Sequence, residues 1–457
     1  MMLTVRNVEV NGRAGSDVRI ERGRIAAISP VLPRGGMEID GRGGALIPGL
    51  CDHHIHLFGL AARAASVPLE GVTSPSQFAE RIAAGVATRP VGAWVRVFGY
   101  HETMAGELTR DDLDRLAPRH PLRLQHQTGA LWVLNSLALA SLGVGDDPPG
   151  VDRDTGRIWR GDAWLRTRIV AEPPPLDRIG ARLAAYGITA LTDASVTNDT
   201  ATAAHLANAC RTGALPQRLT VMSGGPIDMP VDGAFAVGPI KVLLDEQALI
   251  DLDDFVARIG DARTQGRKVA VHCVTAVELA LTLAAFTAAG AEPGDRVEHG
   301  GVIPIEAIPQ LRELNLAVVT QPAFIRERGD RYVTTVAAHE RPDLYRCASL
   351  LAAGVPVAAS SDAPYASPDP WVGITSAMDR LSAGGQLLGG SEAVSAARAL
   401  GLYLDDPMAP GRRLRRIGVG APADLCLLNA PLSEVLAQPS CERVAATIIR
   451  GDIVYLG

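Results

Sequence analysis

Short apolar runs recur through the middle of the chain, and each is followed by polar residues and then by an alanine-rich stretch. Runs of this length are typical of buried strands, and stretches such as 276–290 have the length and composition of helices. The expected strands are 46–54, 187–195, 217–223, 238–245, 268–274, 295–301, 316–322 and 355–364. Eight buried strands that alternate with helices predict an α/β protein with a (β/α)8 TIM barrel.

The two ends of the chain follow another pattern, in which apolar and polar residues alternate with Gly and Asn between the runs. This pattern is typical of half-buried antiparallel strands. Each end is too short to be stable alone, so the two ends are expected to combine. We therefore expect a small composite β-sandwich of residues 1–48 and 408–457, attached to a barrel of residues 49–407.

The chain between the first and second expected strands is far longer than one connecting helix requires. It predicts an insertion after the first strand, at about residues 60–175. Four of the five tryptophans lie there: Trp94, Trp132, Trp159 and Trp164. They form either the core of the insertion or a wall or lid of the active site, as long loops on barrels often do.

Composition narrows the class of protein. The chain has 457 residues, of which 47% are hydrophobic and 21% charged, as in ordinary soluble globular proteins. A net charge of −6 gives no reason to expect nucleic acid or a membrane as a partner. The six cysteines are scattered without a CxxC pair, and no apolar stretch has the length of a membrane helix or the pattern of a signal peptide. We expect a cytoplasmic protein that acts on a small molecule.

Residues that bind metals stand at the ends of the expected strands. His54 and His56 in "CDHHIH" are separated by one residue, so in a strand both point to the same face. His272 and His299 end the fifth and sixth strands, and Asp362 ends the eighth. Each alone is more often a core or turn residue. Together they lie where barrels carry their chemistry and are the usual ligands of zinc and similar metals, which predicts a metal centre.

Lysine is nearly absent, and one of the two lysines, Lys241, lies in the apolar run "GPIKVLLD" of the fourth expected strand. Burial lowers the pKa of a lysine because it disfavours the ammonium form. The neutral amine can react with carbon dioxide to give a carbamate, whose two oxygens can bridge two divalent metals. The simpler alternative is an ammonium that reaches a carboxylate such as Asp245. With the histidines and Asp362 considered, we favour the carbamate.

Several longer motifs support this interpretation: "LIPGLCDHHIHL", "AWVRVFGY", "LTRDDLDRLAP", "LWVLNSLAL", "SSDAPYASPDPWVGITSAMDR" and "GVGAPADLCLLNAPL". They resemble the amidohydrolase superfamily of metal-dependent hydrolases, and most of all amidohydrolase family 3, the YtcJ-like branch related to N-substituted formamide deformylase. The resemblance runs over nearly the whole chain. It implies a barrel with a small β-sandwich built from both chain ends, and it allows a homodimer.

The resemblance also implies a set of ligands for two divalent metal ions, with Zn²⁺ as the first choice. His54, His56 and Asp362 would hold the more buried ion, and His272 and His299 the second. Lys241, as a carbamate, would be shared by both.

The chain departs from the family pattern at three places. Glu246 replaces a usual Gly after the Lys241 segment, and Ala130 stands where many relatives have the His of "DGH". His126, four residues earlier, is the candidate to take its place. Asp162 is the nearest carboxylate where many relatives carry a Glu. The candidate substrate-binding residues are Tyr100, His126, Arg326 and Tyr365.

These residues predict hydrolysis of a C–N bond in an amide, an N-substituted formamide or a cyclic amide, by a hydroxide that bridges two metals. Asp362 is the predicted catalytic residue, which moves a proton to the leaving amine. Neither a GxSxG serine nor a P-loop is present. One alternative is a mononuclear metal-dependent deaminase, which needs a Glu near His272, and Glu278 is six residues away. A second alternative is a non-catalytic scaffold derived from an amidohydrolase.

Overall fold

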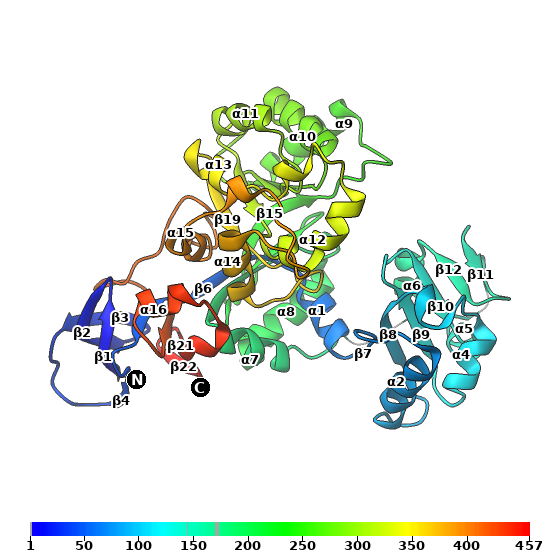
Figure 1. Ribbon diagram of the computed structural model, residues 1–457, viewed down its shortest axis with the longest axis horizontal. Helices are drawn as coiled ribbons and strands as arrows, with labels where there is room; N and C mark the ends of the chain where they lie inside the picture. Colours follow the sequence, from blue (N-terminus) through cyan, green and yellow to red (C-terminus); the bar gives the residue numbers. More distant parts are fainter. Residues whose placement is uncertain (1, 144, 170–172) are drawn as a thin grey trace. The chain divides into compact units, whose positions relative to one another are not determined.

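The computed structural model describes residues 2–143, 145–169 and 173–457 (Figure 1). The chain divides into two compact units, the first Met1–Leu57 with Pro175–Gly457 and the second Phe58–Pro174. Residues 144 and 170–172, which fall in the expected insertion, lie outside the described residues. None of the helices in the described part combines the length and apolar character needed to cross a bilayer.

The first unit contains an eight-stranded parallel sheet in the order β19-β18-β17-β16-β15-β14-β13-β6. Its strands are β6 (Leu50–Ile55), β13 (Ile188–Asp193), β14 (Arg218–Ser223), β15 (Ala236–Val242), β16 (Val269–Cys273), β17 (Arg296–His299), β18 (Ala317–Thr320) and β19 (Val357–Ala359). Each overlaps the segment expected for it, and most of their residues are buried, as in a sheet covered on both faces. The prediction of a TIM barrel is confirmed.

The barrel comes close to closing between its last and first strands. The backbone N–H of Asp362, just after β19, donates to the carbonyl of His54 in β6 at 2.8 Å. The N–H of His56 donates to the carbonyl of Ala363, also at 2.8 Å. His54 in β6 and His56 just after it therefore lie directly beside the segment that carries Asp362.

Helices connect and surround the strands (Figure 1). Helix α1 (Leu57–Ala64) begins with the last residue of the first segment of this unit and continues in the second unit. The other helices of the first unit are α7 (Asp177–Ala185), α8 (Thr200–Thr212), α9 (Leu252–Thr264), α10 (Ala276–Ala289), α11 (Ile308–Glu313), α12 (Ala323–Thr335), α13 (Ala348–Ala352), α14 (Pro370–Asp379), α15 (Ala396–Gly401) and α16 (Leu432–Ala437). Short 3₁₀ helices are η1 (Ile305–Ala307), η2 (Arg341–Asp343), η3 (Gly390–Glu392) and η4 (Cys441–Arg443). Side-chain caps begin several of them: Asp199 accepts from the Thr202 N–H before α8, and Thr275 from the Glu278 N–H before α10.

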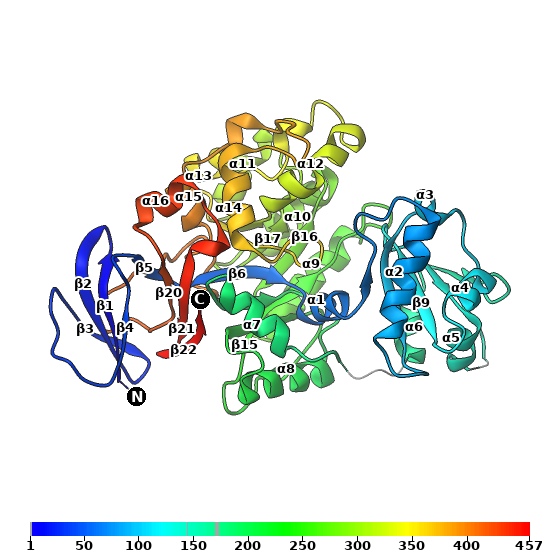
Figure 2. The same ribbon diagram turned by 60° about the horizontal axis from the view of Figure 1, so that its bottom comes forward.

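Strands from both chain ends form one further sheet in the first unit, in the order β22-β21-β20-β5-β1-β2-β3, with β4 paired to β1. Figure 2 shows the blue N-terminal strands beside the red C-terminal ones. The strands are β1 (Met2–Val10), β2 (Arg13–Glu21), β3 (Arg24–Ser29), β4 (Met37–Asp40), β5 (Ala45–Pro48), β20 (Leu425–Leu428), β21 (Val444–Ile449) and β22 (Asp452–Leu456). Antiparallel β5 and β20 join the two ends, with Ile47 opposite Cys426. The division into a sandwich and a barrel domain at the expected boundaries stays a prediction.

The second unit has a six-stranded sheet in the order β11-β12-β10-β9-β8-β7. Its elements are β7 (Val67–Pro68), α2 (Pro75–Ala87), β8 (Val95–Tyr100), α3 (Glu102–Ala105), α4 (Arg110–Leu116), β9 (Leu122–His126), β10 (Leu131–Leu134), α5 (Ser136–Ser141), β11 (Val151–Asp152), β12 (Arg157–Trp159) and α6 (Asp162–Arg168). Strands β7, β8 and β9 are parallel and the others antiparallel. Trp132 is buried in this unit's core with Trp94 and Trp164 packed against it, whereas Trp159 is 53% exposed.

Candidate metal centre

All six predicted ligands belong to the barrel. Each lies in the last residues of a strand or follows the end of a strand. His54 lies near the end of β6 and His56 just after it, and Asp362 follows β19. Lys241, His272 and His299 lie in β15, β16 and β17, which are neighbours in the sheet. His54, Lys241, His299 and Asp362 are buried, and His56 and His272 are partly exposed.

Distances show that the histidines and Asp362 form one cluster. His56 Nε2 is 3.1 Å and His54 Nε2 is 3.4 Å from Asp362 Oδ1. The ring of His54 is 4.7 Å from that of His299, which is 4.5 Å from the ring of His272. The ligand atoms of His54, His56 and Asp362 all lie within 4.8 Å of one another. The structure thus brings together residues that are more than 300 positions apart in the sequence.

Two of these residues have a backbone conformation that residues other than glycine rarely adopt. His299 has φ of 71° and Asp362 has φ of 54°. Alternation along β17 would put His299 on the same side as Val297, but a positive φ interrupts that alternation, and the His299 ring lies against His54 and His272. Such conformations cost free energy and concentrate at functional sites.

Three histidines are oriented by partners on their Nδ1 atoms. His54 Nδ1 contacts the Glu298 carboxylate, His56 Nδ1 lies 2.9 Å from Ser195 Oγ, and His299 Nδ1 lies 2.9 Å from Gln321 Oε1. The oxygens of Glu298 and Gln321 accept the Nδ1 proton, which leaves the Nε2 lone pair of His54 and His299 for a metal. Partners of this kind hold metal-binding imidazoles in one tautomer and orientation.

Glu298, Gln321 and Ser195 were missed by sequence reasoning. Glu298 stands one residue before His299, and it is held in turn by Arg296, whose Nε donates to Glu298 Oε1 at 2.5 Å. Gln321 is held by Ser360, whose hydroxyl accepts from the amide at 2.9 Å. Glu298 could have been noticed because it stands two residues after Arg296 in a buried strand. Two charged residues on one face of a buried strand are rare unless they are paired, so such a pair indicates a specific role.

Several buried polar atoms have no hydrogen-bond partner among the described residues, and three of them belong to the predicted ligands: Lys241 Nζ, His54 Nε2 and Asp362 Oδ1. Leaving such a buried atom unpaired costs about 1–3 kcal/mol. An imidazole and a carboxylate are ligands of divalent transition metals, and the Lys241 amine is close enough to His54 and Asp362 to interact electrostatically with both. The residues present therefore fit a metal centre.

Burial disfavours the charged forms of the amine and of the imidazoles in this centre. Burial lowers the pKa of Lys241, against the opposing effect of the Glu298 and Asp362 carboxylates. Burial also lowers the pKa of His272 to about 3 and that of His54 and His299 well below the usual value, and the charge of Lys241 lowers each further. Neutral imidazoles keep the lone pair that a metal needs, and a neutral amine is the reactive form of lysine.

The predicted substrate contacts have different surroundings. The ring of Tyr365 lies 5.7 Å from that of His56, edge to face, so Tyr365 stands beside the cluster. Arg326 Nη1 lies 3.5 Å from Asp379 Oδ2, in an ion pair on the surface. Tyr100 and His126 lie in the second unit, where the Tyr100 hydroxyl donates to the Gly106 carbonyl. All four roles stay predictions.

Two further carboxylates considered from the sequence have structural partners. Asp162 Oδ1 accepts from the indole N–H of Trp132 at 3.0 Å. Glu278 is buried and accepts from the backbone N–H of Val274 at 2.7 Å and of Thr275 at 3.1 Å, which makes it a cap of α10.

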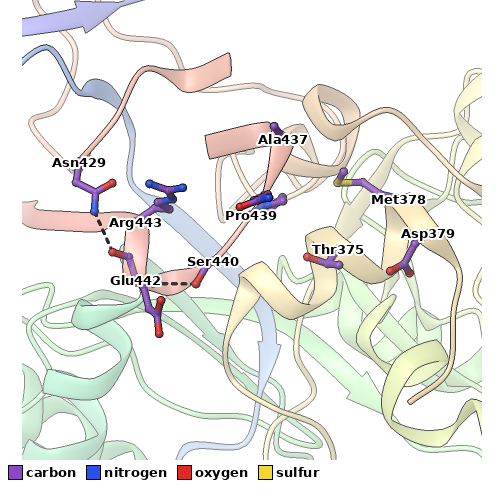
Figure 3. Close-up of a pocket in the computed structure, with 10 residues that line it drawn as sticks. Thr375, Met378, Asp379, Asn429, Ala437, Pro439, Ser440, Glu442 and Arg443 are labelled. Atoms are coloured by element: carbon purple, nitrogen blue, oxygen red, sulfur yellow. Dashed lines mark hydrogen bonds between the residues drawn. The ribbon is translucent and has the colours of Figure 1, made fainter. Parts of the chain in front are cut away.

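A hollow of about 520 Å³ lies elsewhere in the first unit, between α14 and residues 437–443 (Figure 3). Asn429 donates to the Glu442 carbonyl at its edge, and the Glu442 N–H donates to Ser440 Oγ. None of the six predicted ligands is among its lining residues. The hollow is therefore separate from the histidine cluster.

Replacing Ser195 by alanine is expected to weaken metal binding by about 10-fold, with little effect on folding. The change removes the partner of His56 Nδ1 and keeps the backbone N–H of residue 195, which donates to Asp193. Metal affinity is measured by competition with a chelator. Thr197→Ala is the control, because Thr197 is exposed two residues away. Equal affinity in S195A and wild type would show that His56 needs no such partner.

Comparison with known proteins agrees with this geometry. A model of the amidohydrolase family matches residues 37–455. YtcJ of Bacillus subtilis (strain 168), which is named as an amidohydrolase, is 24% identical over 92% of this chain and 90% of its own. N-substituted formamide deformylase of Arthrobacter pascens is also 24% identical, over 93% of this chain and 92% of its own. A solved structure of an uncharacterized metal-dependent hydrolase from Pyrococcus furiosus has the same fold, with a TM-score of 0.75 at 21% identity over 93% of this chain and 98% of that one. The chain therefore belongs to the amidohydrolase family, as its motifs predicted.

Proposed function

We propose that the protein is a metal-dependent hydrolase that cleaves a C–N bond in an amide, an N-substituted formamide or a cyclic amide. The observation that carries this proposal is the set of buried, unpaired atoms Lys241 Nζ, His54 Nε2 and Asp362 Oδ1 beside the remaining histidines. Relatives named as an amidohydrolase and as a formamide deformylase support the reaction class. Two divalent ions, when bound, supply a hydroxide at neutral pH and polarise the substrate carbonyl.

The ligands divide between the two ions by position. His54, His56 and Asp362 would hold the first, because their ligand atoms all lie within 4.8 Å of one another. His272 and His299 hold the second, from neighbouring strands. Zn²⁺ suits this set of imidazole and carboxylate ligands.

Lys241, as a carbamate, would supply an anionic ligand to the ions when they are bound. Its amine nitrogen forms a bond to the carbon of CO₂ and releases one proton, so that a neutral side chain becomes an anion. Burial lowers the pKa of Lys241, which favours the reactive neutral amine. The charge of the carbamate then offsets the positive charge of the ions, which a buried ammonium would increase.

Asp362 is the group that moves the proton. Its Oδ1 has no hydrogen-bond partner in the described residues and lies 3.1 Å from His56 Nε2. A carboxylate in this place accepts the proton of the nucleophile and gives it to the leaving amine, and so avoids release of an unstable amide anion.

The mononuclear deaminase is less well supported. That reaction needs a free carboxylate near His272, and Glu278 is used to cap α10. The scaffold hypothesis predicts loss of ligands, and all six are retained. Neither alternative explains a buried lysine among four histidines.

Metal analysis together with a substrate screen tests the proposal. Zinc is counted as the difference between wild type and a variant with both His54 and His272 replaced by alanine, so that ions bound elsewhere cancel. We expect a difference of two, with hydrolysis of at least one member of a panel of N-acyl amines, N-substituted formamides and cyclic amides. A difference of one with release of ammonia would support the deaminase. No difference and no turnover would support the scaffold.

A further inference from the structure

The second unit contains a cluster of metal-binding side chains of its own, apart from the barrel. It consists of His101, Glu102 and His126, and the ligand atoms of the three all lie within 4.8 Å of one another. His126 Nε2 is 3.1 Å and His101 Nε2 is 3.9 Å from the same oxygen, Glu102 Oε2. The two rings lie 5.6 Å apart and are tilted by 33°.

The sheet of the second unit explains why these residues meet. β8 and β9 are parallel neighbours, and Tyr100 at the end of β8 is paired in register with His126 at the end of β9. His101 and Glu102 directly follow Tyr100, so all three ligands emerge at the carboxyl edge of two parallel strands. Ligand sites of open parallel sheets are found at this edge.

The two histidines are held in the same way by a repeated local motif. His101-Glu102-Thr103 and His126-Gln127-Thr128 both place a threonine two residues after the histidine. The Thr103 hydroxyl lies 3.0 Å from His101 Nδ1, and the Thr128 hydroxyl lies 2.7 Å from His126 Nδ1. Both imidazoles therefore use Nδ1 locally and present Nε2 to Glu102. The backbone N–H of each threonine also donates to that Nδ1, at 3.3 Å for His101 and 3.2 Å for His126. Binding of a metal at Nε2 therefore requires the proton of each ring to move to Nδ1, where the threonine hydroxyl accepts it.

The spacing suits a small divalent ion. Tetrahedral zinc with bonds of 2.0–2.1 Å needs ligand atoms separated by about 3.3 Å. The His126–Glu102 separation of 3.1 Å is close to this value, and the His101–Glu102 separation of 3.9 Å needs only a small movement. His101 and Glu102 can make that movement because their side chains are 37% and 42% exposed, whereas His126 is 10% exposed and fixed.

We propose that His101, Glu102 and His126 form a further metal site that takes Zn²⁺ or a similar ion, with a fourth position open to water or a ligand atom. Two imidazoles and one carboxylate with an open position are a ligand set of zinc sites. The site shares no residue with the six predicted barrel ligands, so its metal content is tested separately from the proposed hydrolase activity.

The test counts zinc in the full-length protein after equilibration with a zinc buffer and desalting. Glu102→Gln is the main variant, because it keeps the size of a half-exposed side chain and so spares folding. His101→Ala is the second variant, and His205→Ala, an exposed histidine of α8, is the control. We expect E102Q and H101A each to bind one zinc ion fewer than wild type, and H205A to bind the same number.

Cobalt gives a second readout, because Co²⁺ in a tetrahedral or five-coordinate site absorbs visible light. The spectrum of wild type minus that of E102Q is expected to show such a band, also when His54 and His272 are both alanine. Equal zinc content in E102Q, H101A and wild type would overturn the proposal. An equal loss of zinc in H205A would overturn it as well, since it would mean non-specific binding to surface histidines.

Discussion

Asp362→Asn is expected to lower kcat by about 10³- to 10⁴-fold, the upper part of the range for general acid–base groups. An asparagine still offers an oxygen to a metal, but it cannot accept a proton from the nucleophile or pass one to the leaving amine. Asp362 Oδ1, unpaired and close to both His54 and His56, is the atom that the substitution disables. The measurement is kcat for an amide found active in the screen, at a metal content matched to wild type.

Asp261→Asn is the control for this change, because Asp261 is exposed on α9 in the first unit. It is expected to keep the wild-type rate. If D362N retained more than about one tenth of wild-type kcat with its metals bound, proton transfer would have to come from another group, and the role proposed for Asp362 would be wrong.

Lys241→Ala is expected to lower kcat/KM by at least about 100-fold and to reduce the metal content, because loss of the shared anionic ligand leaves the positive charge of the ions uncompensated. The chain provides an unusually clean spectroscopic test, since Lys241 and Lys268 are its only lysines. Protein supplied with ¹³C-labelled bicarbonate is expected to show one carbamate signal by NMR. The signal should disappear in K241A and in K241R, because a guanidinium does not form a carbamate.

Lys268→Ala is the matched control. Lys268 is 40% exposed, and its Nζ pairs with the Glu292 carboxylate. K268A is expected to retain both the carbamate signal and the activity. The proposal for Lys241 would be wrong if the wild-type protein were active and fully metallated without any carbamate signal. The role of the unmodified amine would then have to be explained.

The eight barrel strands were predictable because strands buried on both faces are continuous apolar runs, and β13 and β16 are clear examples. The strands of the second unit were not predicted individually. Its sheet mixes parallel and antiparallel strands, and β7 and β11 have only two residues each. Strands that short carry no periodicity from which a pattern can be recognised.

The six metal-ligand candidates could be named from the sequence. They stand at the ends of apolar runs, and these ends become the carboxyl edge of the parallel barrel. Their orientation was decided only by the tertiary structure. Glu298 reaches His54 from 244 positions away, and Gln321 reaches His299 from the next strand. The His299 ring turns into the cluster because of a positive φ that no spacing rule predicts. Local patterns decide which side chains can meet at a strand end, but burial and long-range hydrogen bonds decide which atom each of them presents.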